Sequence, residues 1–141
     1  MKLGSALGVQ TGVLARWSTR AAVSIAGLRV ALGVTALVSP GWAGRTWIGA
    51  GAEGRDRAVT LRALGGRDVA LGFGALLGAS APDDLRRWVL LGAGSDLVDA
   101  VATTIGFSAL PRRRRWLVLA ACAGAATGGV LAAAGMSQDR R

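Results

Sequence analysis

The sequence predicts an all-α protein: a four-helix transmembrane bundle with a short N-terminal interfacial segment. Apolar residues occupy 52% of its 141 positions and charged residues 18%, below the ~25% that is usual for soluble domains. The stretch 116–138 is uncharged over 23 residues, long enough for a helix of about 20 residues to cross the hydrocarbon core. Proline follows three further apolar stretches, at points where helices are expected to end.

These three stretches have the length and apolar content of membrane spans if their interior charges are tolerated; they are 21–39, 59–79 and 88–107. Tryptophans lie at or just beyond the proposed ends, as in the aromatic belts of membrane proteins; they are Trp42, Trp47, Trp88 and Trp116. We therefore divide the chain into an interfacial segment (1–20), one four-span membrane domain (21–136) and a polar tail (137–141). We recognise no signal peptide, because Arg16 and Arg20 interrupt the N-terminal apolar stretch.

Six charged residues fall inside the proposed spans, and their signs cancel: Arg29, Arg62, Arg67, Asp68, Asp96 and Asp99. The remaining 14 basic and five acidic residues give the chain its net charge of +9. A charge at the centre of a bilayer costs at least about 2.5–3.5 kcal/mol on insertion scales, so it usually faces a partner or a water-filled cavity. The pattern predicts a network of ion pairs inside the helices.

The spacing of these residues suggests specific pairs. Asp96 and Asp99 lie three positions apart and share a helix face, which Gly92 and Thr103 extend. Asp68 suits Arg29, and Arg67 suits Asp96 or Asp99. Arg67 and Asp68 point about 100° apart, so they are not expected to pair with each other. Arg62 lies near enough to a span end to extend outward.

The residue inventory disfavours most enzyme classes. The chain has no His, one cysteine (Cys122) and one lysine (Lys2). A zinc site of the usual composition is effectively excluded, no dinucleotide fingerprint or phosphate-binding loop is present, and no usual nucleophile–base pair can be assembled. We expect no metal and no cofactor, although proton transfer by an aspartate stays open.

Four consecutive arginines precede the last span and are interpreted as a membrane-surface anchor: Arg112, Arg113, Arg114 and Arg115. Basic residues beside a span gain about 1 kcal/mol each near anionic lipid headgroups. No interleaved aromatic platform accompanies them, so we do not expect a nucleic-acid partner. Basic residues divide seven against seven between the two sides of the membrane, so the positive-inside rule gives no orientation.

Small residues favour close helix packing. The spacings Gly74-x-x-x-Gly78 and Gly124-x-x-x-Gly128 match small-xxx-small motifs. The Gly- and Ala-rich faces of the last span suit packing within the chain, a homo-oligomer or a larger membrane complex.

Four sequence segments carry a resemblance to known proteins: L-R-A-L-G-G-R-D-V-A-L-G (61–72), R-R-W (86–88), S-D-L-V-D-A (95–100) and P-R-R-R-R-W (111–116). With them the chain resembles, over 29–134, small four-helix integral membrane proteins of GC-rich actinobacteria. The resemblance implies this topology and a bacterial inner (plasma) membrane location. The group has no assigned activity, so it implies no catalytic residue.

The favoured function is that of a non-catalytic membrane protein that acts as a scaffold or binds a lipid or small polar ligand. The alternative is a proton- or cation-coupled carrier subunit that uses Asp96 and Asp99. A soluble Ala/Gly-rich helical protein is a third interpretation, which extraction without detergent would support.

Overall fold

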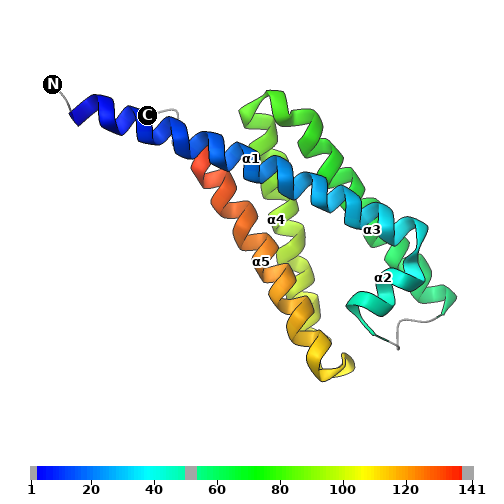
Figure 1. Cartoon of the computed structure of the whole chain (residues 1–141). Coiled ribbons are helices and arrows are strands. Elements are labelled where there is room, and N and C mark those ends of the chain that lie inside the picture. Colours follow the sequence, from blue (N-terminus) through cyan, green and yellow to red (C-terminus); the bar gives the residue numbers. More distant parts are fainter. Residues whose placement is uncertain (1–2, 50–53, 138–141) are drawn as a thin grey trace.

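The computed structural model describes residues 3–49 and 54–137, with the side chains of 16–49 and 54–136. Within these residues the chain is all-α, as predicted. Its helices are α1 (Leu3–Val38), α2 (Pro40–Trp47), α3 (Arg55–Leu77), α4 (Pro82–Ile105) and α5 (Arg112–Ser137), with 3-10 turns at Gly78–Ser80 and Phe107–Ala109. Figure 1 shows their arrangement. The end of the predicted polar tail, 138–141, lies outside the described residues.

Three of these helices contain stretches that are long and apolar enough to cross a membrane: Arg16–Val38, Pro82–Ile105 and Arg112–Met136. They correspond to the first, third and fourth predicted spans. Helix α3, the second predicted span, is not among them, because every 18-residue stretch of it holds at least three charged residues, whereas α4 has a stretch of that length with two. The composition of the described chain therefore indicates a membrane protein with three candidate spans.

Several predicted boundaries were wrong. Prolines begin helices here as well as following them: Pro40 opens α2, and Pro82 opens α4 six residues before the predicted start at 88. The first position of a helix needs no N–H donor and suits the fixed φ of proline. Helix α1 continues unbroken through residues 20 and 21, so no break separates the predicted interfacial segment from the first span. The short helix α2 was not predicted.

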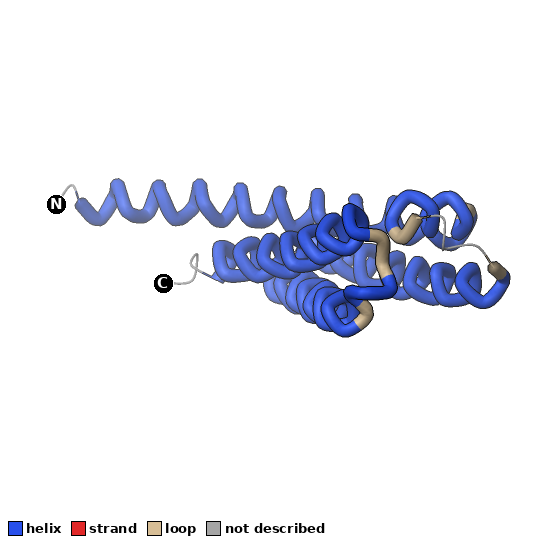
Figure 2. The backbone as a smooth tube through the Cα atoms, turned by 90° about the horizontal axis from the view of Figure 1, so that it is seen from below, coloured by secondary structure: helices blue, strands red, loops and turns tan. Residues whose placement is uncertain are grey.

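The long helices form two antiparallel pairs, α1 with α3 and α4 with α5 (Figure 1). The pairs cross each other instead of running parallel, so the arrangement departs from a conventional four-helix bundle. Figure 2 shows that the N-terminal part of α1 projects beyond the other helices. The charged residues that connect the two pairs run from α1 and α3 to α4.

The core between the pairs is built from small side chains. Its buried residues include five alanines, Leu85, Val89 and Met136. Many large apolar side chains face outward instead: Ile105 is 81% exposed, Leu131 66% and Leu28 61%. Soluble monomers rarely expose large contiguous apolar patches, so this distribution fits a lipid-facing surface.

Glycines bring α1 and α3 into close contact. A Cβ atom on Gly65 would lie 2.6 Å from the carbonyl oxygen of Gly33, and one on Gly72 would lie 2.7 Å from that of Ala26. Both approaches are shorter than real Cβ contacts, so only glycine fits. The two small-xxx-small motifs of the sequence do not include these glycines.

Of the predicted glycine motifs, Gly74 and Gly78 do pack closely. A Cβ on Gly74 would meet the Trp88 ring at 2.7 Å, and one on Gly78 the backbone of Asp84 at 3.1 Å. In α5, by contrast, a Cβ on Gly124 would meet nothing within 4 Å, and the close approach to α4 is at Gly129, where a Cβ would lie 3.0 Å from that of Ala93.

Replacing Gly65 with alanine is expected to destabilise the protein by about 1–3 kcal/mol, the usual cost of overpacking. The new methyl group would meet backbone atoms of α1, which cannot rotate away. Gly27→Ala is the control, because a Cβ on Gly27 meets nothing within 4 Å. Denaturant unfolding in detergent would measure the difference. Equal stability of the two variants would contradict the tight α1–α3 contact.

Candidate functional site

Five of the six predicted interior charges form one continuous ion network where α1, α3 and α4 meet. In order, it runs Asp96–Arg29–Asp68–Arg67–Asp99. Arg29 comes from α1, Arg67 and Asp68 from α3, and the other two aspartates from α4. Acidic and basic residues alternate along the network, so each charge touches only charges of the opposite sign.

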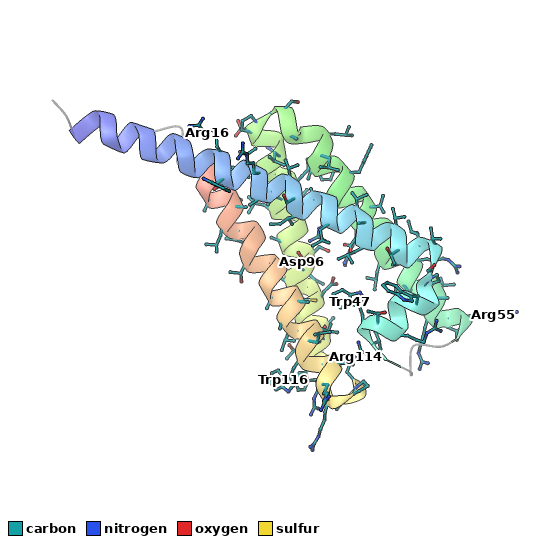
Figure 3. The ribbon with its side chains drawn as sticks, viewed as in Figure 1. Arg16, Trp47, Arg55, Asp96, Arg114 and Trp116 are labelled. Carbon is teal, nitrogen blue, oxygen red and sulfur yellow. The ribbon has the colours of Figure 1, made fainter. Side chains whose placement is uncertain are left out.

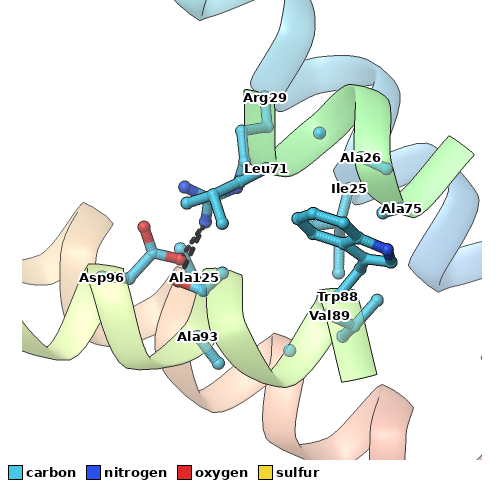
Figure 4. A pocket seen from close by; sticks show the side chains of 13 residues that line it. Ile25, Ala26, Arg29, Leu71, Ala75, Trp88, Val89, Ala93, Asp96 and Ala125 are labelled. Atoms are coloured by element: carbon cyan, nitrogen blue, oxygen red, sulfur yellow. Dashed lines mark hydrogen bonds and ion pairs between the residues drawn. The ribbon is translucent and has the colours of Figure 1, made fainter. Parts of the chain in front are cut away.

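Arg29 occupies the more buried end of the network. Its Nη1 donates to Oδ1 of Asp68 at 2.9 Å, and its Nη2 donates to Oδ2 of Asp96 and to the carbonyl oxygen of Gly92 at 3.3 Å. Figure 4 shows the guanidinium directed at Asp96. The side chains of Arg29 and Asp96 are each only 11% exposed. The predicted pairing of Arg29 with Asp68 is confirmed.

Arg67 forms the more open end. Its Nη1 and Nη2 donate to the two carboxylate oxygens of Asp99 at 3.0 and 2.7 Å, a bidentate arrangement that adds geometric specificity as well as energy. The two side chains are 32% and 29% exposed. Of the two partners predicted for Arg67, the structure thus selects Asp99.

Arg67 also contacts its neighbour Asp68, which contradicts the prediction that these adjacent residues do not pair. The Nη2 atom of Arg67 lies 3.3 Å from Oδ1 of Asp68. The long arginine side chain spans the 100° between the two positions while it reaches for Asp99. Oδ1 of Asp68 therefore accepts from both arginines and joins the two ends of the network.

The ion pairs differ in which helices they connect. Arg29–Asp96 and Arg67–Asp99 each link the α1/α3 pair to the α4/α5 pair, whereas Asp68 holds Arg29 and Arg67 together within α1/α3. Three carboxylates and two guanidinium groups give the network a formal charge of −1. The exact balance of three and three predicted from the sequence does not hold locally.

Arg62 and Thr103 were predicted in the network but lie outside it. Arg62 is exposed, and its Nε donates to the carbonyl oxygen of Leu37 at 3.2 Å. It precedes Arg67 by five positions, about 140° around the helix, so it points elsewhere. The hydroxyl of Thr103 donates to the Asp99 carbonyl oxygen of its own helix at 2.7 Å, a local bond common in helices.

A small cavity adjoins the buried end of the network. Its volume is about 20 Å³, and Arg29, Asp96, Gly72 and Trp88 are among its lining residues (Figure 4). Such a volume suits about one water molecule. Trp88 was predicted as an interfacial belt residue, but its partly buried ring packs on Gly74 between α3 and α4.

The arginine cluster divides into two parts. Arg114 donates to the carbonyl oxygen of Thr46 and so ties the start of α5 to α2. The guanidinium of Arg115 lies 4.7 Å from the centroid of the Phe107 ring, a cation–π distance. Arg112 and Arg113 are exposed. Figure 3 shows Arg114 at the start of α5 and Asp96 between the helices.

Sequence reasoning missed the aromatic contact beside this cluster. Phe107 meets Trp116 edge to face with ring centroids 4.8 Å apart. Among the described residues, no group of three or more His, Cys, Asp or Glu side chains is arranged to hold a metal ion.

Comparisons with protein-family models, with curated proteins and with solved structures found no match. The resemblance to the actinobacterial membrane proteins therefore stays a prediction.

Proposed function

We propose that the protein is a non-catalytic, multi-pass scaffold of a bacterial plasma membrane, in which the ion network fastens two crossed helix pairs. The observation that carries the proposal is the pair of links Arg29–Asp96 and Arg67–Asp99 between α1/α3 and α4/α5. Apart from these links, the contact between the pairs is made mainly by small side chains. The network thus supplies directional contacts where apolar packing is thin.

Helix α3 is the fourth crossing in this proposal. Its 23 residues span about 35 Å at 1.5 Å per residue, enough for the hydrocarbon core. It packs closely along α1 through Gly33, Gly65 and Gly72. Its central charges, Arg67 and Asp68, are paired within the network, and pairing is how charges are accommodated in membranes.

The scaffold role is favoured over the binding of a small polar ligand at the network. The cavity beside Arg29 and Asp96, about 20 Å³, is far below the roughly 300–1,000 Å³ of ligand pockets. In the membrane, the outward-facing Arg112 and Arg113 would lie against anionic lipid headgroups. Their location at the start of α5 supports this contact with the headgroups.

A proton- or cation-coupled carrier subunit is the second candidate, and one observation favours it. The network has one carboxylate more than it has guanidinium groups. A proton or cation could neutralise the excess charge, and Asp96 and Asp99 would then be the exchanging groups.

Asp96→Asn distinguishes the two functions. In a scaffold, loss of this carboxylate leaves Arg29 with one ion-pair partner and is expected to destabilise the protein by about 1.5–3 kcal/mol, the range for hydrogen bonds to charged groups. The folded fraction would be measured by size-exclusion chromatography and denaturant unfolding in detergent. Asp56→Asn, at an exposed carboxylate of α3, is the control.

Proton flux into proteoliposomes is measured with the same two variants. A stable Asp96→Asn protein that has lost a wild-type flux would establish the carrier and overturn the scaffold. A stable variant with no flux in either protein would show that the network does not hold the helix pairs together.

A further inference from the structure

An apolar groove runs between α4 and α5, on a face that the ion network does not use. Its volume is about 440 Å³, and its walls include Leu90, Gly94 and Leu97 on α4 and Ala126, Val130 and Leu131 on α5. This volume lies in the range of ligand sites. Gly94 leaves the groove open, because a Cβ there would meet nothing within 4 Å.

Charged residues continue the same face of α4 beyond one end of the groove. Arg86 and Arg87 precede Leu90 by four and three positions, and Asp83 and Asp84 lie about one further turn toward the start of the helix. Helical side chains lean toward the N-terminus, so the arginines extend away from the groove toward that end. The order along α4 is therefore apolar groove, guanidinium groups, carboxylates.

The two ends of this charged strip are accessible. The side chain of Arg87 is 77% exposed and that of Asp84 57%, and their atoms approach only to 3.7 Å. Exposed ion pairs of this kind contribute little to stability. Each group can therefore leave the other and bind a ligand instead. Arg86 is held at the groove end, where its Nε donates to the carbonyl oxygen of Ala133 on α5 at 3.3 Å.

We propose that this groove binds one phospholipid with an ethanolamine headgroup, an acyl chain lying between α4 and α5. The phosphate meets Arg86 and Arg87, and the primary ammonium group meets Asp84. The chemical order of such a lipid, from chain to phosphate to ammonium, matches the order of groups along α4. A glycerol headgroup has no cation for the carboxylates, and a choline headgroup cannot donate N–H bonds to them. The inference rests on the proposed membrane location and is independent of the ion network.

The test compares three lipids with equal acyl chains, phosphatidylethanolamine, phosphatidylglycerol and phosphatidylcholine, each titrated in mixed micelles against the purified full-length protein. Native mass spectrometry counts the bound lipids. We expect phosphatidylethanolamine to bind at least about fivefold more tightly than the other two, the equivalent of one good polar contact. Equal or tighter binding of phosphatidylglycerol would overturn the proposal.

Two variants locate the site. Gly94→Leu fills the groove and is expected to reduce phosphatidylethanolamine binding by about tenfold, whereas Gly27→Leu, the same change at an open position of α1, leaves it unchanged. Asp84→Asn is expected to remove the preference over phosphatidylglycerol while lipid still binds. Arg55→Gln, at the start of α3 (Figure 3), is the control for a charge change at a distance.

Other results would show a different occupant. If the wild type is a dimer that Gly94→Leu converts to a monomer without loss of lipid, a second copy of the chain fills the groove and the proposal is wrong. If Gly94→Leu and Gly27→Leu bind lipid equally, the lipid lies elsewhere. These measurements count bound lipid, so they are distinct from the assembly and flux measurements that test the scaffold.

Discussion

Replacing Arg29 with methionine is expected to destabilise the folded protein by about 3–5 kcal/mol, the cost of breaking a buried ion pair by removing one partner. Arg29 is the ion-pair partner of Asp96 and one of two partners of Asp68. The Asp96 side chain is only 11% exposed, so its charge would stay inside the helices without a cation. Methionine keeps most of the side-chain length, and the effect therefore reports the lost charge.

Arg62→Met supplies the matched control for Arg29→Met. Arg62 lies in a neighbouring helix and is exposed, and its Nε donates to a backbone carbonyl oxygen. We expect this change to cost less than about 1 kcal/mol, as for most exposed positions. Unfolding of both variants in detergent gives the comparison. Similar losses of stability would show that Arg29 in the network contributes no more to stability than an exposed arginine.

A second substitution tests the cause of the loss. If Arg29→Met destabilises because Asp96 is left charged and unpaired, adding Asp96→Asn should recover part of the stability. Contacting residues couple by about 0.5–3 kcal/mol. A double variant whose losses simply add would instead point to the packing of the Arg29 side chain against the cavity wall.

The residues that form the ion network could be predicted from the sequence. The charges Arg29, Arg67, Asp68, Asp96 and Asp99 were predictable because a charge in an apolar stretch needs a partner, and helical periodicity showed which charges shared a face. The pairing of Arg29 with Asp68 followed from their similar depth. The choice of Asp99 for Arg67 did not, because Asp96 lies on the same face of the same helix.

The crossing of the helix pairs was not predictable in the same way. Periodicity identifies a helix and its faces, but the angle between helices depends on which small residues meet. Here Ala26, Ala75 and Ala133 are among the small residues at which the two pairs meet, and a chain rich in alanine with 22 glycines offers many equivalent choices. Trp88 shows the same limit, since its place at a predicted span end favoured the interface although a glycine opposite accepts its ring.

Reversing the Arg67–Asp99 pair is the second change for which we expect a large effect. Asp99→Arg would place two guanidinium groups side by side and remove a bidentate pair, at an expected cost of about 3–5 kcal/mol. Arg67→Asp would set three carboxylates together and should cost as much. The double reversal restores an opposite pair between α3 and α4, so we expect it to recover about 1–3 kcal/mol relative to additive losses.

Recovery should be incomplete, because the new aspartate at 67 lies beside Asp68 and the contact between Arg67 and Asp68 is lost. Arg62→Asp combined with Asp99→Arg is the mismatched control: its net charge equals that of the true swap, but Arg62 contacts Leu37 and not the network. Unfolding in detergent of the singles and doubles completes the cycle. If Arg67–Asp99 links the helix pairs, the true swap should show a coupling energy and the mismatched double variant should show none. Equal coupling energies in the two double variants would show that only net charge matters. The proposed scaffold role would then lose its support.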